Sequence, residues 1–204
     1  MTHGMKRFII PFLLLGASLL TNIYANAYAA HTASNPVSDI VLTNTPVFDV
    51  DQIFVFGSIL LVLSIVIVCS IHPQTIPFVL YSLALFYFIR AGFVSLTHLA
   101  PYPDQSPIYF HSDFATEVSK LLFGGGLFFS GHTGAPFLIA LAFWQKKLVR
   151  YFFIAWSIFF ATIVLLGHMH YSIDVASAYF ITYAVYHLAM QLFRKEYEVF
   201  LNKR

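Results

Sequence analysis

Two short segments carry residues that together could transfer a phosphoryl group. In the first, His170 and Asp174 lie four residues apart in the sequence GHMHYSIDVASA of residues 167–178, at the start of an apolar segment. In a helix this spacing places both side chains on one face, one turn apart. The carboxylate can then hold the imidazole through Nδ1–H, so that Nε2 stays basic and available as a nucleophile or proton carrier.

The second segment is SGHT, residues 130–133, which contains His132. The small residue Ser130 and the glycine Gly131 would let a phosphate oxygen come close to backbone N–H groups. Two histidines and one acid suffice for phosphoryl transfer without a metal. We therefore expect His132, His170 and Asp174 to be catalytic, Ser130 and Gly131 to bind substrate, and no cofactor to be needed.

Arg90 lies about two thirds of the way along an apolar segment of residues 76–100. A guanidinium in hydrocarbon is costly and usually faces a polar cavity, where its planar fork can bind phosphate oxygens with two hydrogen bonds. The alternative is a side chain that extends to the outer membrane interface. We expect Arg90 to bind the substrate phosphate.

The composition is that of a membrane protein. Of the 204 residues, 59% are hydrophobic and 10% are charged, against roughly 25% charged residues in soluble domains. We predict an all-α, polytopic integral membrane protein that forms a single domain over residues 1–204, with its catalytic motifs within residues 90–182. The net charge of +2 is too small to indicate nucleic-acid binding. Cys69 is the only cysteine, which excludes an intramolecular disulfide and a thiolate metal site.

Six membrane spans are expected, at residues 8–28, 53–71, 76–100, 127–144, 151–167 and 171–193. The sequence ANAYAA at residues 25–30 could instead end a cleaved signal peptide, which would leave five spans. The length of the first apolar segment favours a retained span. Residues 145–150 (QKKLVR) are expected to form a cytoplasmic loop, and residues 101–126 an outer loop that could close over the site as a lid.

The cations of this topology gather on one side of the membrane, which the positive-inside rule identifies as the cytoplasm. Arg90 and Lys120 are the two exceptions among eleven. The other nine are Lys6, Arg7, Lys146, Lys147, Arg150, Arg194, Lys195, Lys203 and Arg204. Both chain ends then face the cytoplasm, and the two histidine motifs and Arg90 lie toward the outer ends of their spans. This convergence predicts one shared site on the non-cytoplasmic face.

The motifs also carry a family resemblance. Residues 165–182 (LLGHMHYSIDVASAYFIT) resemble the last catalytic motif of sphingomyelin synthases, a branch of the type 2 phosphatidic acid phosphatase, or lipid phosphate phosphatase, superfamily. In that branch an H-Y-[ST]-x-D core opens the final membrane span, and SGHT resembles the preceding motif. Arg90, Thr97, Leu99, Pro101 and Pro103 are similar to the family's R…T…L-x-P-x-P segment. Residues 36–40 (PVSDI) are similar to its first short motif.

Two departures from the family pattern bear on the substrate. Gly124, Gly125 and Gly126 stand where the resemblance calls for Cys-Gly-Asp before SGHT. Ile163 and Val164 stand where phosphatase relatives usually carry a Ser-Arg pair. The second departure favours the synthase branch over the phosphatase branch.

The resemblance implies a double displacement. His170 would attack the phosphorus of a phospholipid, Asp174 would orient it, and His132 would protonate the leaving diacylglycerol oxygen and later deprotonate the acceptor. Arg90 and backbone donors around Ser130 and Gly131 would stabilise the phosphate charge. The implied partners are a phospholipid carrying phosphocholine or phosphoethanolamine and a ceramide-like or diacylglycerol alcohol. A compact chain with short tails favours a bacterial inner membrane.

Three alternatives stay open. If water is the acceptor, the protein is a lipid phosphate phosphatase that hydrolyses phosphatidate or similar lipids. His168 and His170 would share a face in an extended segment and, with His132 and Asp174, could ligate zinc; in a helix His168 would point about 200° away and would pack against neighbours. A lipid transporter or channel that uses Arg90 for selectivity would not need the His170–Asp174 pair. The sequence leaves the oligomeric state open.

Overall fold

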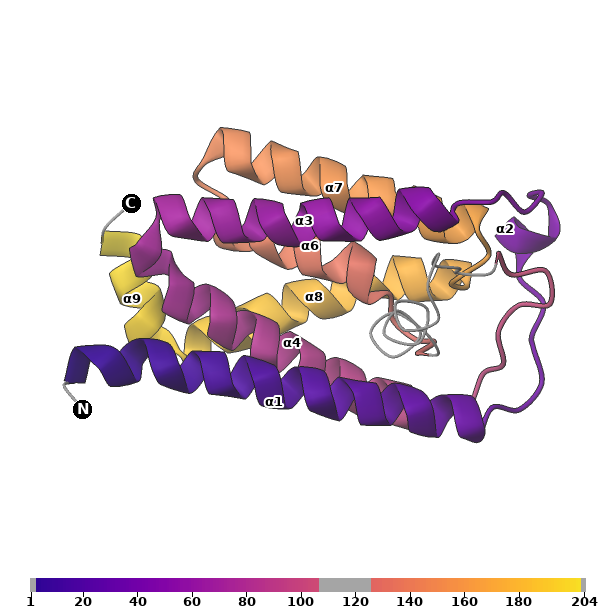
Figure 1. Cartoon of the computed structure of the whole chain (residues 1–204), viewed down its shortest axis with the longest axis horizontal. Helices are drawn as coiled ribbons and strands as arrows, with labels where there is room; N and C mark the ends of the chain where they lie inside the picture. The colour runs from indigo at the N-terminus through magenta and orange to yellow at the C-terminus, as the bar shows by residue number, and fades with distance from the viewer. Residues whose placement is uncertain (1–2, 107–125, 203–204) are drawn as a thin grey trace.

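The computed structural model of the protein describes residues 3–106 and 126–202. The described residues are helical apart from turns and loops, and they contain no strand. The elements are α1 His3–His31, α2 Ile40–Thr43, α3 Asp51–Ile71, η1 Pro73–Thr75, α4 Ile76–Leu96, α6 Gly131–Ala142, α7 Lys147–Leu166, α8 Ser172–Leu192 and α9 Arg194–Asn202. The long helices run along one elongated bundle, with both termini at the same end (Figure 1).

Among the described residues, four helical segments are long and apolar enough to cross a membrane, and they indicate an integral membrane protein. They are Lys6–His31, Asp51–Ile71, Pro73–Leu96 and Lys147–Leu166. α6 has only 12 residues, a length of about 18 Å against the ~30 Å of a hydrocarbon core. α8 has 21 residues but carries Asp174, His187 and three tyrosines, and it is not among the four. The six-span count stays a prediction.

The expected fourth span, residues 127–144, is wrong in its bounds because a cap fixes a later start. Ser130 is the N-cap of α6, and its Oγ accepts a hydrogen bond from the backbone N–H of Thr133 at 3.3 Å. Phe128, two residues before Ser130, has a positive φ of 69°, which a helix does not allow. Hydropathy alone does not reveal such a cap, so the apolar run overestimates the helix.

Two other boundaries differ from the expectation. α4 ends at Leu96 rather than near residue 100, and Thr97 is extended; Pro101 disfavours helix in the residue before it. α7 already begins at Lys147, so the expected loop of residues 145–150 shrinks, because Lys147 to Arg150 form the first helical turn. Most of the expected outer loop, with its lid, Lys120, Gly124 and Gly125, lies outside the described residues.

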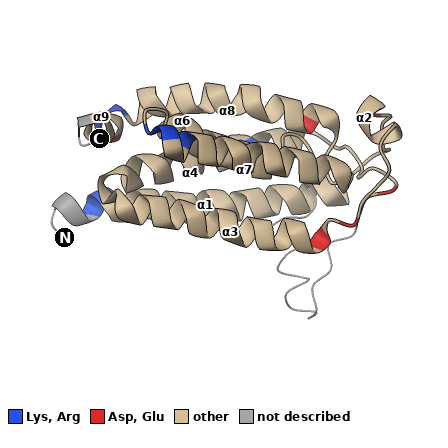
Figure 2. Cartoon of the chain, turned by 90° about the horizontal axis from the view of Figure 1, so that it is seen from above, with Lys and Arg blue, Asp and Glu red and all other residues tan. Residues whose placement is uncertain are grey.

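Charge is separated along the bundle (Figure 2). Most of the Lys and Arg residues drawn there gather at the end that carries both termini, whereas most of the Asp and Glu residues lie at the opposite end. This separation agrees with the asymmetry in the sequence. Which end faces the cytoplasm stays a prediction.

Packing positions the helices that carry the motifs. α6 contacts both α7 and α8, and α1 packs along α4. Phe86, Phe129, Phe153 and Phe160 are completely buried in the core between them. Small residues allow the close approach of α1 and α4: Ala25 and Ala29 on α1 form a buried cluster with Ala91 and Val94 on α4.

Candidate functional site

The centre of the candidate site is the pair formed by His170 and Asp174 at the start of α8. Asp174 Oδ2 lies 3.1 Å from His170 Nδ1 and also accepts the backbone N–H of Tyr171 at 3.1 Å. Asp174 is completely buried and His170 is 8% exposed. α8 begins only at Ser172, so His170 precedes the helix. The predicted pairing is present, but through the cap of α8 rather than through one helical face.

This contact assigns the protonation of His170. An ionised carboxylate only accepts hydrogen bonds, so Nδ1 carries a hydrogen; in the neutral ring Nε2 then has the free lone pair. Asp174 lies in the first turn of α8, where the helix dipole favours a negative charge. Its other oxygen, Oδ1, is buried and has no hydrogen-bond partner within the described part of the chain. An ionised Asp174 can therefore stabilise positive charge on His170.

The SGHT segment is attached directly to this pair. The backbone N–H of Ser130 donates to the backbone oxygen of Asp174 at 3.0 Å. His132, in the first turn of α6, lies half-buried, and its ring packs on Phe54 and Phe160 at centroid distances of 4.5 and 5.4 Å. His132 lies two positions after Ser130, which is bonded to Asp174. The three predicted groups therefore lie in one neighbourhood.

Ser130 and Gly131 have structural contacts that the sequence did not reveal. Ser130 Oγ accepts from both the backbone N–H and the hydroxyl of Thr133, at 3.3 and 3.1 Å, and its own N–H is used by Asp174. Gly131 lies against Arg90, because a Cβ at Gly131 would stand 3.2 Å from Arg90 Nε. The N–H of Ser130 is thus engaged, and Gly131 lets the guanidinium come close to the motif.

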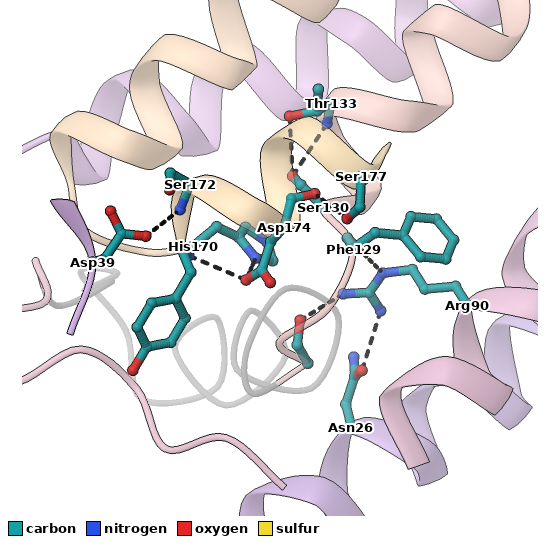
Figure 3. Close-up of polar contacts among 12 residues, drawn as sticks. Asn26, Asp39, Arg90, Phe129, Ser130, Thr133, His170, Ser172, Asp174 and Ser177 are labelled. Carbon is teal, nitrogen blue, oxygen red and sulfur yellow. Dashed lines mark hydrogen bonds and ion pairs between the residues drawn. The ribbon is translucent and has the colours of Figure 1, made fainter. Parts of the chain in front are cut away.

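Arg90 is 6% exposed and binds protein acceptors on three sides (Figure 3). Nε donates to Phe129 O at 3.2 Å, and the second terminal nitrogen donates to Gly126 O at 2.8 Å. The first terminal nitrogen donates to the amide oxygens of Asn22 and Asn26 at 2.8 and 3.2 Å. A guanidinium has five N–H donors, and these four bonds leave one. Arg90 therefore holds the segment before SGHT against α1.

This arrangement explains why a glycine can stand at position 126. A Cβ added to Gly126 would collide with the amide oxygen of Asn26 and lie 2.9 Å from a terminal nitrogen of Arg90. An acid at this position, as the family pattern suggests, needs a different placement of Asn26. In this chain the side chains of Asn22 and Asn26 fill the space beside Arg90.

Asp39 is a site residue to which sequence reasoning gave no role. Its Oδ2 accepts the backbone N–H of Ser172 at 2.7 Å, while Oδ1 caps α2 by accepting from Val41 and Leu42 at 2.8 and 3.1 Å. Burial raises the Asp39 pKa, but the hydrogen bonds, led by that of Ser172, together lower it below its usual value. The PVSDI motif is thereby fixed to the start of α8. The motif resemblance was the only signal for this acid.

Tyr171 ties a second loop to the same point. Its hydroxyl donates to Ala100 O at 2.9 Å and accepts the backbone N–H of Val37 at 3.3 Å. The side chain is 1% exposed. The segment that follows Arg90 in the chain and the PVSDI segment therefore both meet at the residue between His170 and the first turn of α8.

His168 has a supporting role, as the packing alternative predicted. It adopts a positive φ of 52° just after α7. Its Nε2 donates to Thr45 O at 3.0 Å, and its ring packs edge to face on Tyr102 at 5.1 Å. The ligand set of the zinc alternative is not assembled: the described residues contain no cluster of three or more His, Cys, Asp or Glu side chains that could hold a metal ion.

Comparison with known proteins identifies a related family for part of the chain. The family model described as PAP2 superfamily C-terminal matches residues 125–191, which include His132, His170 and Asp174. This match supports a relation to the type 2 phosphatidic acid phosphatase superfamily, whose members are phosphatases and phosphotransferases. It does not reach Arg90 or residues 36–40, and it does not distinguish the synthase branch. No curated protein and no solved structure matches the chain significantly.

Proposed function

We propose that this protein is a membrane phosphotransferase that moves a phospho-headgroup from a glycerophospholipid to a lipid alcohol through a phosphohistidine on His170. The observation that carries the proposal is the 3.1 Å contact between His170 Nδ1 and the buried Asp174 carboxylate, in a segment that matches the superfamily. The donor headgroup is phosphocholine or phosphoethanolamine, and the acceptor is a ceramide-like alcohol or diacylglycerol. A transporter or channel has no need of this pair.

In the first half-reaction His170 Nε2 attacks the phosphorus of the donor. A nitrogen–phosphorus bond forms as the bond from phosphorus to the diacylglycerol oxygen breaks, and protonated His132 gives that oxygen its proton. The phosphorylated imidazole keeps its hydrogen on Nδ1 and becomes positively charged. Asp174 stabilises that charge across the 3.1 Å contact.

In the second half-reaction the acceptor alcohol takes the place of diacylglycerol. His132, now neutral, removes the hydroxyl proton as the alcohol oxygen attacks phosphorus, and the bond between phosphorus and His170 Nε2 breaks. The enzyme returns to its starting protonation. The aromatic rings of Phe54 and Phe160 beside His132 would limit access of water and so favour a lipid alcohol as acceptor.

Arg90 supplies positive charge to the phosphate in this proposal. Its fifth N–H is the one that no described residue accepts. A fixed donor aimed at the transferring group stabilises charge that develops in the transition state. Ser130 would contribute its hydroxyl hydrogen, since its backbone N–H is engaged, and Gly131 its backbone N–H.

The alternative is a lipid phosphate phosphatase, and the superfamily match supports it in general terms. The positions at which phosphatase relatives carry a Ser-Arg pair hold Ile163 and Val164, which are 8% and 0% exposed within the apolar core. A terminal phosphate carries more charge than a diester and needs more donors. With one spare N–H on Arg90, the site suits a diester donor.

The decisive experiment follows a headgroup label. Purified protein receives phosphatidylcholine or phosphatidylethanolamine labelled in the headgroup, together with ceramide or diacylglycerol. The proposal expects label in a new lipid, formed with diacylglycerol, in wild type and His187→Ala, and none in His132→Ala or His170→Ala. His187 is a matched control, because it is partly exposed on α8 and its hydrogen bond and ring contacts in the described part of the chain are with residues of its own helix.

Two results would contradict the transferase. Release of the label as water-soluble phosphocholine or phosphoethanolamine would show hydrolysis of the diester. Rapid release of inorganic phosphate from phosphatidate, with no diester turnover, would establish the phosphatase instead.

We further propose that the site faces away from the cytoplasm, in a bacterial inner membrane. The test uses single cysteines in a Cys69→Ala background and a thiol reagent that does not cross membranes. Val47→Cys, in the exposed loop before α3, should label in intact cells, and Gln145→Cys, in the exposed turn before α7, should not. The opposite pattern would reverse the proposed sidedness.

A further inference from the structure

A groove of about 480 Å³ runs between α1 and α4. Each helix contributes a stripe of residues at spacings of three and four, which is one helical face. The small residues Ala25, Ala91 and Gly92 lie between the larger side chains of Tyr24, Tyr28 and Phe88. Tyr24 is 74% exposed and Tyr28 is 50% exposed, so the groove opens outward.

The groove presents an apolar surface to the membrane. Both of its walls belong to segments that are long and apolar enough to span, so it opens toward lipid. Of the four hydroxyl-bearing residues in its lining, the two with aliphatic side chains are already bonded within their own helices: Thr21 Oγ1 donates to Ala17 O at 2.9 Å and Ser95 Oγ donates to Ala91 O at 2.8 Å. Thr21 and Ser95 therefore need no polar group from an occupant of the groove.

The extent of the groove selects the kind of occupant. Each stripe covers seven residue steps, which is about 10.5 Å of helix, and eight residues line the groove. A stable protein interface uses roughly 20–30 residues a side, so this surface is too small for a partner protein. A length of about 10.5 Å is roughly a third of the ~30 Å hydrocarbon core. It suits the part of one acyl chain that lies nearest the headgroup.

The groove also adjoins the candidate site. Arg90 immediately precedes Ala91 and Gly92 on α4, and the Asn22 and Asn26 side chains that bind Arg90 flank Ala25 on α1. The lining residues belong to the last part of both helices, which run in the same direction toward the end that carries α2 and the start of α8 (Figure 1). A lipid with a chain in the groove has its headgroup near that end.

We propose that the α1–α4 groove holds one acyl chain of the lipid substrate while the phosphate reaches Arg90 and His170. This inference rests on the proposed function, since it concerns the lipid that the site would use. It assigns to Tyr24, Tyr28 and Phe88 the role of packing along the chain. The acyl chain, rather than the headgroup alone, then contributes to substrate binding.

Two glycines provide a matched pair of variants. A Cβ at Gly92 would meet no heavy atom within 4 Å, and the same is true of Gly16 on α1, which is not part of the groove. Gly92→Leu fills the groove without disturbing the core, whereas Gly16→Leu adds the same side chain elsewhere on the membrane-facing surface. Both changes replace a helical glycine by a better helix former, so both variants should fold.

The kinetic test compares long-chain and four-carbon-chain phospholipids with one headgroup. We expect Gly92→Leu to raise the KM for the long-chain donor about tenfold, in the range that a hydrophobic pocket gives for a few methylenes, with kcat unchanged. The KM for the four-carbon donor should stay the same, and Gly16→Leu should match wild type for both donors. An equal KM change in the two variants, or no change in either, would overturn the groove.

A binding test separates failure of the groove from failure of the proposed function. The probe is a phosphatidylcholine with a photoactivatable diazirine in one acyl chain, added to purified protein in detergent and competed with unlabelled lipid. We expect competable labelling within residues 21–28 or 88–95 that falls at least fivefold in Gly92→Leu and persists in Gly16→Leu. Such labelling without any headgroup turnover would support the groove and sink the proposed phosphotransfer.

The opposite pattern is equally informative. Turnover without competable labelling in these two segments would leave the phosphotransferase and overturn the groove. A disulfide between two chains of Gly92→Cys, formed in the Cys69→Ala background and accompanied by loss of lipid labelling, would show that a second copy of the chain occupies this surface and would also overturn the inference.

Discussion

The two ends of the bundle are held together in different ways. At the end with the candidate site, loops are joined by directional hydrogen bonds, such as those of Asp39 to Ser172 and of Arg90 to Phe129 O. At the end with the termini, aromatic rings pack against one another. Phe200 lies 5.5 Å from Phe78 and 5.4 Å from Phe143 between ring centroids.

The difference matches what each end has to do. Transfer of a phosphoryl group requires reacting atoms at set distances and angles, and hydrogen bonds fix angles as well as distances. Apolar packing fixes volume and tolerates small rearrangements. We therefore expect substitutions at the site end to change the rate more than the stability, and substitutions at the aromatic end to do the reverse.

The largest effect should come from Asp174→Asn, which tests this division at its centre. Asparagine keeps an oxygen that can accept from Tyr171 but loses the charge that stabilises phosphorylated His170, and comparable changes in catalytic triads reduce kcat about 10⁴-fold. We expect a loss of about 10³- to 10⁴-fold in kcat for headgroup transfer, with thermal unfolding nearly unchanged. A loss below tenfold, or one that follows unfolding, would break the comparison.

The next effect concerns the opposite end. Phe200 is 1% exposed, and Phe200→Ala leaves a cavity that should reduce the free energy of unfolding by about 3 kcal/mol. The kcat of the folded enzyme should stay within about twofold of wild type, because the site's hydrogen bonds are untouched. Denaturation in detergent measures the first quantity. Leu201→Ala, an adjacent and 39% exposed residue, is the control and should cost less than about 0.5 kcal/mol.

A pair of identical substitutions at the two ends sharpens the comparison further. Arg90→Lys keeps the charge but loses the fork that serves Phe129 O, Gly126 O and the two asparagines. We expect a loss of about 100-fold in kcat. Arg150→Lys, whose guanidinium stacks on Trp144 and Tyr151 at 4.7 and 4.6 Å, should keep activity within about twofold. Similar losses in both variants would show that the position of an arginine along the bundle does not matter.

The sequence predicted the long helices because each one is a continuous apolar run. α3 and α8 lie within two residues of their expected bounds. The sequence did not predict the shortness of α6 or the early start of α7, because hydrophobicity does not report where a cap such as Ser130 fixes the first turn. The six-span count depends on α6 and α8, the two helices that are least typical of free-standing spans.

Local contacts of the site could be predicted from the sequence, and distant ones could not. The His170–Asp174 contact spans four positions, so its spacing is visible in the chain. Asp39 reaches Ser172 across 133 positions, and Asn22 reaches Arg90 across 68. No periodicity links such residues. Arg90 was expected to bind phosphate oxygens with two hydrogen bonds, because the protein groups that accept four of its N–H donors are not visible in the sequence.

The smallest predicted effect is that of Asp39, and its pH dependence distinguishes the two kinds of support. Asparagine has one acceptor oxygen and cannot both cap α2 and bind Ser172, so Asp39→Asn should cost about 1 kcal/mol of stability at pH 7 and slow transfer a fewfold by loosening the start of α8.

Hydrogen bonds outweigh burial and lower the Asp39 pKa. Because the pKa of Asp39 is lower in the folded state, its carboxylate stabilises the fold fully at any pH above its unfolded-state pKa of about 3.9. This stabilisation is lost as the pH falls through the folded-state pKa. The difference between wild type and Asp39→Asn in thermal unfolding should therefore be full at pH 7 and shrink below about pH 4, while Asp49→Asn, an exposed acid of the same loop, should change little at either pH. A penalty that stays the same at pH 3 would show that Asp39 acts through packing, as Phe200 does, and would remove the contrast between the two ends at this residue.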